Sequence, residues 1–429
     1  MGRTLLVVLF LLLAIDRPAP AGERTPLGKS LNDIETADHW IYDDWPAAVA
    51  EAKKTGKPIL AVIRCVPCPP GKDLDLKVMQ PNKDLAELEQ QFVCVRIIQT
   101  NRLDQKIFQY DYDMSWSCMF LNANGTVYGR YGSRSASGPG SDSILNAGAF
   151  SKAARRALEL HKGYPANAKQ LAAKTGPDPE YAVPTQIPGL TEKPASASVR
   201  QECIHCHMVK EFALRAKWEE GRLKAEDLFV YPMPQRIGLT MSQEDDLKVQ
   251  RVEEGSAADE AGIEAGDTLV SLGGQPLVSM ADIQWVLTHT PGEAKLPVKF
   301  TRGGQTEESK LELSGDWKKS DIAWRASSWY ALRQGVKFEP LPAADRKARG
   351  IGEDELALVV KGLFGKGGPK VQQAGLRQND VLVAVDGKTQ AMTESEFLVD
   401  LRLQHGPKDS VKFTVLRGDQ RRDFDVPLW

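Results

Sequence analysis

Six cysteines and six histidines are the residues of this 429-residue chain whose types and spacing suit redox or metal chemistry. The cysteines fall into two C-x-x-C pairs and two single residues: Cys65 with Cys68, Cys203 with Cys206, then Cys94 and Cys118. Two thiols at this spacing can form a disulfide with each other or bind one shared ligand. A scaffold held by structural disulfides is not expected, because a chain of this length can bury hydrophobic cores of its own.

The second pair lies in residues 203–207, which read Cys-Ile-His-Cys-His and match the C-x-x-C-H sequence to which haem c is attached. This segment resembles c-type cytochromes. The resemblance implies thioether bonds from Cys203 and Cys206 to haem c, with His207 as the proximal iron ligand. Met233, which precedes a proline, is the distal ligand that the resemblance implies, and Met208, Met241 or a histidine are the alternatives.

Two other chemistries fit the same segment. His205 could activate Cys203 in a C-x-H-C dithiol of the kind found in disulfide isomerases. Alternatively, Cys203, Cys206 and His207 could bind zinc. The sequence therefore leaves haem, dithiol and zinc open for this pair.

The first pair follows directly after a predicted strand. The flanking sequence predicts a helix, a buried strand before the cysteines, three later strands and a closing helix: 45–54, 59–63, 92–98, 118–121, 126–131 and 149–161. An Asn-Gly turn joins the last two strands. These elements place Cys65 and Cys68 at a strand end in an α/β unit.

This order of elements resembles the thioredoxin-like superfamily. Exported members carry Ala-x-x-x-Ala-Lys-x-x-x-Lys-Pro before the first strand, supplied here by Ala48, Ala52, Lys53, Lys57 and Pro58. The resemblance implies a thioredoxin-like domain at 30–165. In that family, the first cysteine of the pair attacks and the second resolves the mixed disulfide, roles that fall here to Cys65 and Cys68.

Three positions depart from the thioredoxin-like pattern. Arg64 stands where a Trp commonly precedes the first cysteine, and Pro69-Pro70 follows the second, where a continuing helix needs backbone N–H groups. Residues 115–117, Ser-Trp-Ser, stand where the family has a cis-proline that docks the substrate backbone. A non-catalytic thioredoxin-like scaffold is therefore the alternative to a redox-active dithiol.

The two single cysteines, Cys94 and Cys118, lie within apolar strands. Such cysteines are expected to be small buried side chains rather than ligands. Because Cys118 falls close to where the first C-x-x-C pair should face, a three-thiol metal site is a further alternative.

Prolines among small and polar residues characterise the segment after the α/β unit: Pro177, Pro179, Pro184, Pro188 and Pro194. This composition predicts a stiff, extended linker at 166–200. The linker leads into the C-x-x-C-H segment at 201–235. That segment is too short to be a domain, so neighbouring domains would have to supply most of a haem pocket.

The remainder of the chain contains a repeat. Residues 255–274 recur at 371–387 as a short helix, an Ala-Gly-apolar turn, an aspartate and an alternating strand. This pattern resembles PDZ domains of the type found in HtrA-like exported proteases. Two PDZ domains are therefore expected, at 236–316 and 331–429, each with a groove helix that begins at a capping signal.

A PDZ domain binds an extended peptide by adding it to a sheet edge beside the groove helix. In the first copy, the resemblance implies that the loop Ile237, Gly238 and Leu239 receives the peptide carboxylate and that Ile283 contributes to an apolar pocket. In the second copy, the loop is expected near Gly335. Protein or peptide C-termini are thus the expected partners. The alternative is a PDZ fold that only packs against its neighbours.

The first residues of the chain predict export. Arg3 precedes an apolar run at 5–15, and Ala19-Pro20-Ala21 provides a small-residue cleavage site, so residues 1–21 are expected to be a signal peptide. The apolar run is too short to span a bilayer, and no membrane span is expected after its removal. A periplasmic or otherwise extracytoplasmic location follows. The net charge of -2 and the lack of a basic block argue against nucleic acid as a partner.

The sequence therefore predicts a multidomain protein: an α/β thioredoxin-like domain, a short C-x-x-C-H segment and two β-rich, α+β PDZ domains. The expected function is that of an exported redox protein, either a thiol-disulfide oxidoreductase or an electron-transfer protein, whose PDZ domains recruit protein partners. The alternative is a non-enzymatic PDZ adaptor. A protease is not expected, because there is no G-x-S-x-G sequence and no histidine suited to a triad.

Overall fold

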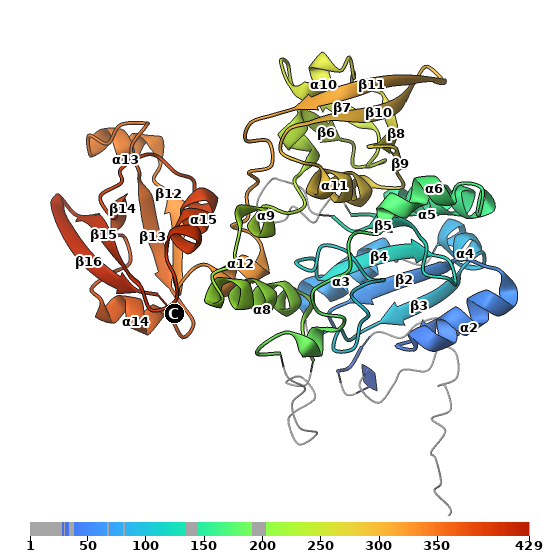
Figure 1. Ribbon diagram of the computed structural model, residues 1–429, viewed down its shortest axis with the longest axis horizontal. Coiled ribbons are helices and arrows are strands. Elements are labelled where there is room, and N and C mark those ends of the chain that lie inside the picture. Colours follow the sequence, from blue (N-terminus) through green and yellow to red (C-terminus); the bar gives the residue numbers. More distant parts are fainter. Residues whose placement is uncertain are drawn as a thin grey trace, which may run out of the picture.

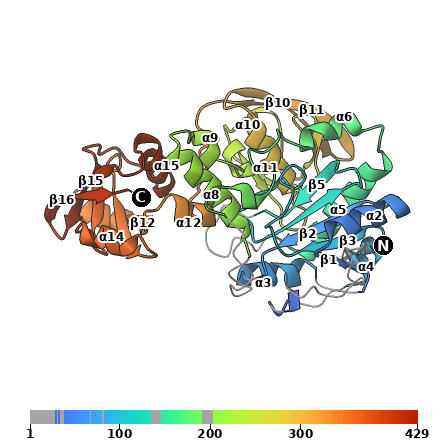
Figure 2. The same cartoon turned by 60° about the horizontal axis from the view of Figure 1, so that its bottom comes forward.

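The computed structural model describes residues 28–29, 31–33, 38–66, 68–79, 82–133, 145–190 and 203–428 (Figures 1 and 2). The predicted signal peptide and the end of the predicted linker lie outside these residues. No helix within the described ranges is long and apolar enough to cross a membrane. An α/β domain is followed by two smaller β-rich domains, one packed against it and one set apart beyond three connecting helices.

A five-stranded sheet forms the centre of the α/β domain, in the order β1-β3-β2-β4-β5. Its strands are β1 Ile41–Tyr42, β2 Ile59–Arg64, β3 Val93–Ile97, β4 Trp116–Leu121 and β5 Val127–Tyr131. β2 runs parallel to β3 and antiparallel to β4. All residues of β2 to β5 are buried, which explains their nearly continuous apolar sequences.

Helices cover both faces of this sheet. The helices are α2 Trp45–Thr55, α3 Pro69–Val78, α4 Lys83–Glu89 and α5 Ala147–Lys162. Alternate residues of β2 face opposite sides: Ala61 packs in the cluster that contains α2, whereas Leu60 and Val62 pack with α3, α4 and α5. The helices and strands predicted from periodicity are confirmed to within about two residues at their ends.

The described part of the predicted linker is not extended. It contains α6 Ala168–Leu171 and two short 3-10 segments, η2 Ala172–Lys174 and η3 Pro184–Gln186. Lys174 is fully buried, with its Nζ 2.7 Å from Asp282 Oδ2. The prediction of a stiff linker is therefore corrected for residues 166–190, which pack between the α/β domain and the next domain.

The C-x-x-C-H segment continues into helices that connect the domains. α8 Cys206–Glu219 and α9 Ala225–Leu228 follow one another, and α12 Ala326–Ala331 packs against α8. Trp218, in the last turn of α8, is buried in the core of the last domain and donates a hydrogen bond to the carbonyl of His405 (2.7 Å). The helix α8 therefore extends from the cysteine segment into the second repeat domain.

The first repeat domain contains a two-stranded sheet and a four-stranded sheet. Its elements are η4 Pro234–Ile237, β6 Leu239–Met241, β7 Val249–Val252, α10 Ala257–Glu260, β8 Thr268–Leu272, β9 Gln275–Pro276, α11 Met280–His289, β10 Ala294–Arg302 and β11 Gln305–Leu313. The sheets have the orders β6-β7 and β11-β10-β8-β9. The helix α11 packs against β5, so this domain lies on the edge of the thioredoxin-like sheet (Figure 1).

The second repeat domain contains one five-stranded sheet, β12-β13-β14-β15-β16. Its elements are β12 Val336–Pro340, α13 Ala343–Ala348, β13 Leu358–Leu363, α14 Gly368–Gln373, β14 Val381–Val385, α15 Glu394–Gln404, β15 Ser410–Arg417 and β16 Gln420–Pro427. Its core is separate from that of the first repeat domain, and it includes residues of α8 and α9.

An ion pair explains the aspartate that both repeats share. In the first copy, Arg302 donates two hydrogen bonds to Asp267, at 2.9 and 2.7 Å. In the second copy, Arg417 makes the same paired contact with Asp380, with both distances 2.7 Å. The two aspartates accept backbone N–H bonds as well, from Glu264 and from Arg377, which fixes the turn before each strand.

Candidate functional site

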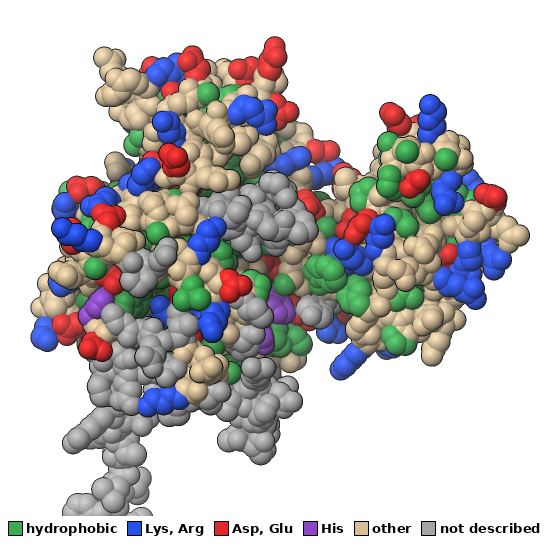
Figure 3. Space-filling model, turned by 180° about the vertical axis from the view of Figure 1, so that it is seen from behind, with side chains coloured by type: hydrophobic (Ala, Val, Ile, Leu, Met, Phe, Trp, Pro, Cys, Tyr) green, Lys and Arg blue, Asp and Glu red, His purple; other side chains and the backbone are tan. Residues whose placement is uncertain are grey.

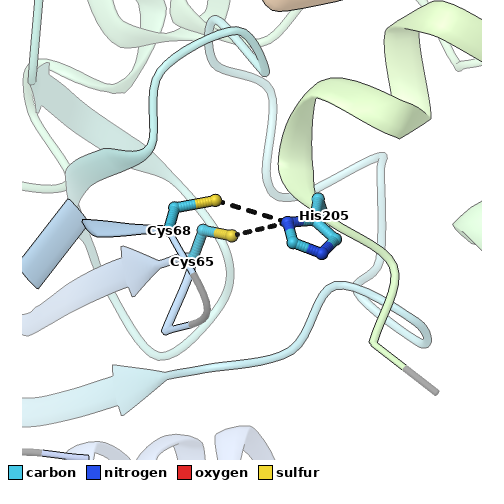
Figure 4. A group of neighbouring side chains, drawn as sticks. All are labelled: Cys65, Cys68 and His205. Carbon is cyan, nitrogen blue, oxygen red and sulfur yellow. Dashed lines mark hydrogen bonds between the residues drawn. The ribbon is translucent and has the colours of Figure 1, made fainter. Parts of the chain in front are cut away.

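Cys65, Cys68 and His205 come together beside the end of β2. His205 Nδ1 lies 3.2 Å from Cys65 Sγ and 3.3 Å from Cys68 Sγ, and both sulfurs point toward the ring (Figure 4). Cys65 is buried, with 5% of its surface exposed, whereas Cys68 and His205 are half-buried. The structure thus brings the first cysteine pair against the middle residue of the second.

The local sequence explains how the two thiols are held. Cys65 follows β2 directly, and its N–H donates to the carbonyl of Ser115, 3.0 Å away. Helix α3 starts only after Cys68, which is its N-cap residue. Pro69 and Pro70 occupy the first helical positions, where amide N–H groups have no partner within the helix and proline is tolerated. Helix α3 therefore begins directly after Cys68, with the two prolines in its first turn.

The contact between the two sulfurs acts in opposite directions on the pKa of the two thiols. The pKa of Cys68 is lowered to about 5, first by the hydrogen bond with Cys65 and then by contact with His205, and burial opposes both effects. The pKa of Cys65 is raised by the same Cys65–Cys68 hydrogen bond and by burial. The hydrogen bond with Cys68 also raises the pKa of His205. The sequence implied Cys65 as the attacking thiolate, whereas these contacts favour Cys68.

Backbone contacts fix His205 at this position. Both contacts are made by Ile204, the residue before His205. The carbonyl of Ile204 accepts a hydrogen bond from Thr100 Oγ1 (2.5 Å), and the backbone N–H of Ile204 donates to Asn101 Oδ1 (2.9 Å). Ile204 also packs in an apolar cluster with Val209 and residues of the preceding segment. Sequence reasoning considered His205 only as a partner of Cys203. The sole signal for a wider role was a histidine next to two cysteines.

The two cysteines of the C-x-x-C-H sequence are buried, and Cys206 contacts the thioredoxin-like domain. Cys203 and Cys206 are 8% and 4% exposed, and Tyr110 donates its hydroxyl to Cys206 Sγ (3.5 Å). Burial raises the pKa of Cys206 to about 12. The Nδ1 atom of His207 lies 3.6 Å from a carboxylate oxygen of Glu211 in the next turn of α8.

The implied distal ligand, Met233, lies in a different environment. Its sulfur accepts a hydrogen bond from Gln284 Nε2 of α11 (2.9 Å), within the first repeat domain. With both thiols buried, Cys206 in contact with Tyr110 and Met233 held by another domain, these residues do not form a haem pocket in this packing. Haem c attachment stays a prediction, and no chemical step is derived from it.

The single cysteines behave as expected from the sequence. Cys94 and Cys118 are almost fully buried within strands, and burial raises the pKa of both thiols. Within the described residues, the one group of three or more Cys, His, Asp or Glu side chains placed to share a metal ion is Cys65, Cys68 and His205. Cys118 is not part of it, so the three-thiol alternative is corrected.

A buried ionic network lies behind the thiols and includes Arg64, whose role the sequence did not reveal. Its guanidinium pairs with Asp33 and lies 3.6 Å from Asp75, a residue of α3. Asp75 also accepts hydrogen bonds from Arg96 (2.8 Å) and from the indole N–H of Trp116 (2.9 Å). These contacts tie α3 to three strands of the sheet and stabilise the position of the cysteine loop.

The residues implied in peptide binding by the first repeat domain lie together in its core. Ile237, Leu239 and Ile283 belong to one apolar cluster, and each is at most 2% exposed. Gly238 separates the first two with a positive φ of 90°, a conformation that favours glycine. The expected loop and pocket are therefore adjacent. Whether they bind a peptide stays a prediction.

The corresponding edge of the second repeat domain is closed by its own residues. β12 is an edge strand, and its alternate positions Val336, Phe338 and Pro340 share one side. The N–H of Val336 donates to the carbonyl of Arg333 (2.9 Å), that of Phe338 donates to Glu394 Oε1 (3.3 Å), and proline has no N–H. An added peptide strand finds no donor on this side.

Comparisons with known proteins agree with this domain structure. A thioredoxin-like family model matches residues 40–123, and a PDZ domain model matches 235–313 and 355–428. The periplasmic serine endoprotease DegP of Escherichia coli K12 is 26% identical over 221 residues, which cover 50% of this chain and 42% of DegP. The periplasmic pH-dependent serine endoprotease DegQ of the same strain is 31% identical over 138 residues, or 32% of this chain and 28% of DegQ.

Solved structures give short matches. The PDZ domain of HtrA3 bound to a phage-derived ligand is 28% identical, with a TM-score of 0.14, and the match covers 15% of this chain and 60% of that domain. A serine endoprotease from Yersinia pestis is 24% identical, with a TM-score of 0.17, over 18% of this chain and 28% of its own. The chain spans less than half the length of the curated relatives above. From the family models and the observed folds together, this chain consists of a thioredoxin-like domain followed by two PDZ domains.

Proposed function

We propose that this protein is an extracytoplasmic thiol-disulfide exchange protein whose PDZ domains recruit protein partners. The observation that carries the proposal is the contact of His205 Nδ1 with both sulfurs of the Cys65–Cys68 pair, at 3.2 and 3.3 Å. An imidazole at this distance stabilises a thiolate and exchanges protons with a thiol. The packed ionic network of Arg64 and Asp75 fixes the loop that carries the pair.

The exchange step follows from the exposure and protonation of the two thiols. The Cys68 thiolate attacks one sulfur of a partner disulfide, and the other partner sulfur leaves as a thiolate that takes up a proton. Cys65 then transfers its proton to His205 or to water and attacks Cys68, which releases the partner's second thiol. The partner disulfide is reduced to two thiols, and Cys65 and Cys68 become a disulfide. Two electrons and two protons pass to the partner.

The PDZ domains provide the partner contact in this proposal. A PDZ domain of HtrA3 has been solved with a phage-derived peptide ligand, and curated relatives of this chain are named as periplasmic proteases. In this chain the first PDZ domain is the better candidate, because the β12 edge of the second is blocked by Glu394. Peptide C-termini with an apolar last residue are the proposed ligands. The predicted signal peptide and the periplasmic relatives both support an extracytoplasmic location.

A redox titration of the full chain tests the exchange function. The protein is equilibrated in glutathione buffers of graded potential, quenched with acid and analysed by mass spectrometry after alkylation. We expect a two-electron transition that forms a Cys65–Cys68 disulfide and is absent from Cys65→Ser and Cys68→Ser. The buried Cys94→Ser variant serves as the matched control and should retain the transition. Thiols that stay reduced in fully oxidised glutathione would contradict the proposal.

A non-enzymatic PDZ adaptor is the second candidate. Two observations favour it: Cys65 is only 5% exposed, and the ring of His205 lies against both thiols. The Cys65→Ser variant separates the two functions, since it should trap a mixed disulfide between Cys68 and a partner protein only if exchange occurs. Binding of C-terminal peptides without any trapped partner would favour the adaptor.

A further inference from the structure

The cluster of Cys65, Cys68 and His205 has the composition of a metal site as well as that of a dithiol. The three ligand atoms, two sulfurs and one imidazole nitrogen, all lie within 4.8 Å of one another. They come from two segments separated by about 140 residues, so the tertiary fold, and not a local sequence pattern, assembles them. A single ion of ordinary radius placed between the three atoms can contact all of them.

The donor set restricts the identity of the ion. Thiolate sulfur selects soft metals such as Cu(I) and Zn(II) over Mg(II), Ca(II) or Mn(II), which require oxygen ligands. No carboxylate belongs to the cluster in the described part of the chain. Structural zinc is almost always four-coordinate, whereas Cu(I) is stable with three ligands. Two sulfurs and one nitrogen therefore fit Cu(I) best.

The ligands are held in place without the ion. Cys65 is fixed by the hydrogen bond from its N–H to the Ser115 carbonyl (3.0 Å), and Cys68, the N-cap residue of α3, donates its N–H to the Cys65 carbonyl (3.2 Å). His205 is fixed by two hydrogen bonds to the adjacent residue, Ile204, from Thr100 and Asn101. A ligand set that is already ordered avoids most of the entropy cost of closing around a metal.

We propose that Cys65, Cys68 and His205 form a binding site for one Cu(I) ion. Binding replaces the protons on the two thiols and uses the unprotonated Nδ1 of the imidazole, so protons are released and no electrons are transferred. The site goes beyond the proposed thiol exchange, which needs the two sulfurs but no metal. Copper and the Cys65–Cys68 disulfide exclude each other, because the same sulfurs form both.

Competition with a Cu(I) chromophore under anaerobic conditions tests the site. The reduced full chain is titrated with Cu(I) in the presence of bicinchoninate. We expect one equivalent of copper to be withheld from the chromophore by the wild type, and Cys65→Ser and Cys68→Ser to release it. His205→Ala should weaken the affinity by at least about tenfold, since one of three ligands is lost. X-ray absorption of the wild-type complex should show two sulfur neighbours and one nitrogen neighbour.

Matched variants separate this site from other thiols and imidazoles. Cys94→Ser and His39→Ala remove a buried thiol and a surface imidazole outside the cluster, and both should bind copper as the wild type does. The double variant Cys203→Ser/Cys206→Ser should also retain one equivalent. Loss of copper from this double variant, or unchanged affinity in His205→Ala, would overturn the assignment. Preferential binding of Zn(II) by the wild type would overturn the choice of copper.

The metal site and the exchange function can fail independently. Disulfide exchange is measured on metal-free protein in the presence of a copper chelator, and copper binding is measured on fully reduced protein. His205→Ala is expected to lose affinity for copper and yet to form the Cys65–Cys68 disulfide, because that bond requires only the sulfurs. Circular dichroism of each variant confirms that the fold is retained.

Discussion

Replacing His205 by Ala tests whether this imidazole sets the reactivity of the dithiol. In the wild type, His205 Nδ1 lies 3.3 Å from Cys68 Sγ, and the pKa of Cys68 is lowered to about 5. The variant removes one hydrogen bond and one partial positive charge from the thiolate but leaves the hydrogen bond from Cys65. We therefore expect the pKa of Cys68 to rise in the variant while staying below that of an ordinary thiol.

The size of the effect follows from the distance. A charged or hydrogen-bonding group within about 4 to 6 Å of an ionised side chain typically shifts the pKa by about 1 to 3. A rise of about 2, in the middle of this range, leaves Cys68 mostly protonated at pH 6, where the wild-type thiol is mostly ionised. Because the thiolate is the reactive form, alkylation of Cys68 at pH 6 should then become about tenfold slower.

Site-resolved alkylation provides the assay. Metal-free, reduced protein is treated with iodoacetamide between pH 4 and pH 10, and peptide mapping reports the rate at each cysteine. His207→Ala is the matched control: its charge is among the smaller influences on Cys68, so it should produce a smaller rise in pKa. Identical pH profiles for wild type and His205→Ala, or a larger effect from His207→Ala, would refute the role assigned to His205.

Three further predictions concern the packing of the PDZ domains. Asp282→Asn removes the ion pair with the fully buried Lys174, 2.7 Å away, and should lower the free energy of unfolding by about 3 to 5 kcal/mol in thermal or urea denaturation. Burial raises the pKa of Asp246 to about 7, so the folded chain retains a proton that the unfolded chain releases above pH 4. Stability should therefore fall between pH 4 and pH 7, by at most about 4 kcal/mol, and Asp246→Asn should abolish this fall. Glu394→Ala frees the N–H of Phe338 and should allow the second PDZ domain to bind C-terminal peptides with an affinity on the order of micromolar, measured by fluorescence anisotropy.

Each of these predictions has an outcome that contradicts it. If Asp282→Asn lowers the free energy of unfolding by less than about 1 kcal/mol, water reaches the pair of Lys174 and Asp282, and this pair contributes little to the contact between the domains. Equal pH dependence in wild type and Asp246→Asn would show that another carboxyl group titrates in this range. If Glu394→Ala binds no peptide, the single N–H of Phe338 is not enough for binding, and the Arg333 carbonyl and Pro340 keep the β12 edge closed.

The domain folds were predictable because local patterns determine them. The apolar run of β2 and the Lys57-Pro58 step after α2 are visible in the sequence, and the repeated aspartate before β8 and β14 marked the two PDZ domains. Each signal depends on residues within one element or one turn, where periodicity and capping are informative. The segment 166–190 was misread for the opposite reason. Its proline content suggested an extended chain, but the burial of Lys174 depends on Asp282, a residue 108 positions later.

The candidate site was predictable only in part. The C-x-x-C pairs and the nearby histidines could be identified from spacing, but the contact between His205 and the first pair joins residues 140 and 137 positions apart. No periodicity encodes such a contact. The assignment of the thiolate to Cys65 also followed the general pattern of the family. In this chain the hydrogen bond between the two thiols lowers the pKa of Cys68 and raises that of Cys65.

Helix α8 connects the candidate site to the second PDZ domain, which stands apart from the rest of the molecule (Figure 3). His205 is the N-cap residue of α8, and Trp218, in its last turn, is buried in the core of the second PDZ domain. A helix of this length is about 20 Å long and behaves as a nearly rigid rod. The helix therefore joins the imidazole beside Cys65 and Cys68 to the core of the second PDZ domain, while Thr100 and Asn101 hold its first turn on the thioredoxin-like domain. The first PDZ domain is attached differently, because its buried Asp282 lies 2.7 Å from Lys174 and 3.6 Å from Arg130 of β5.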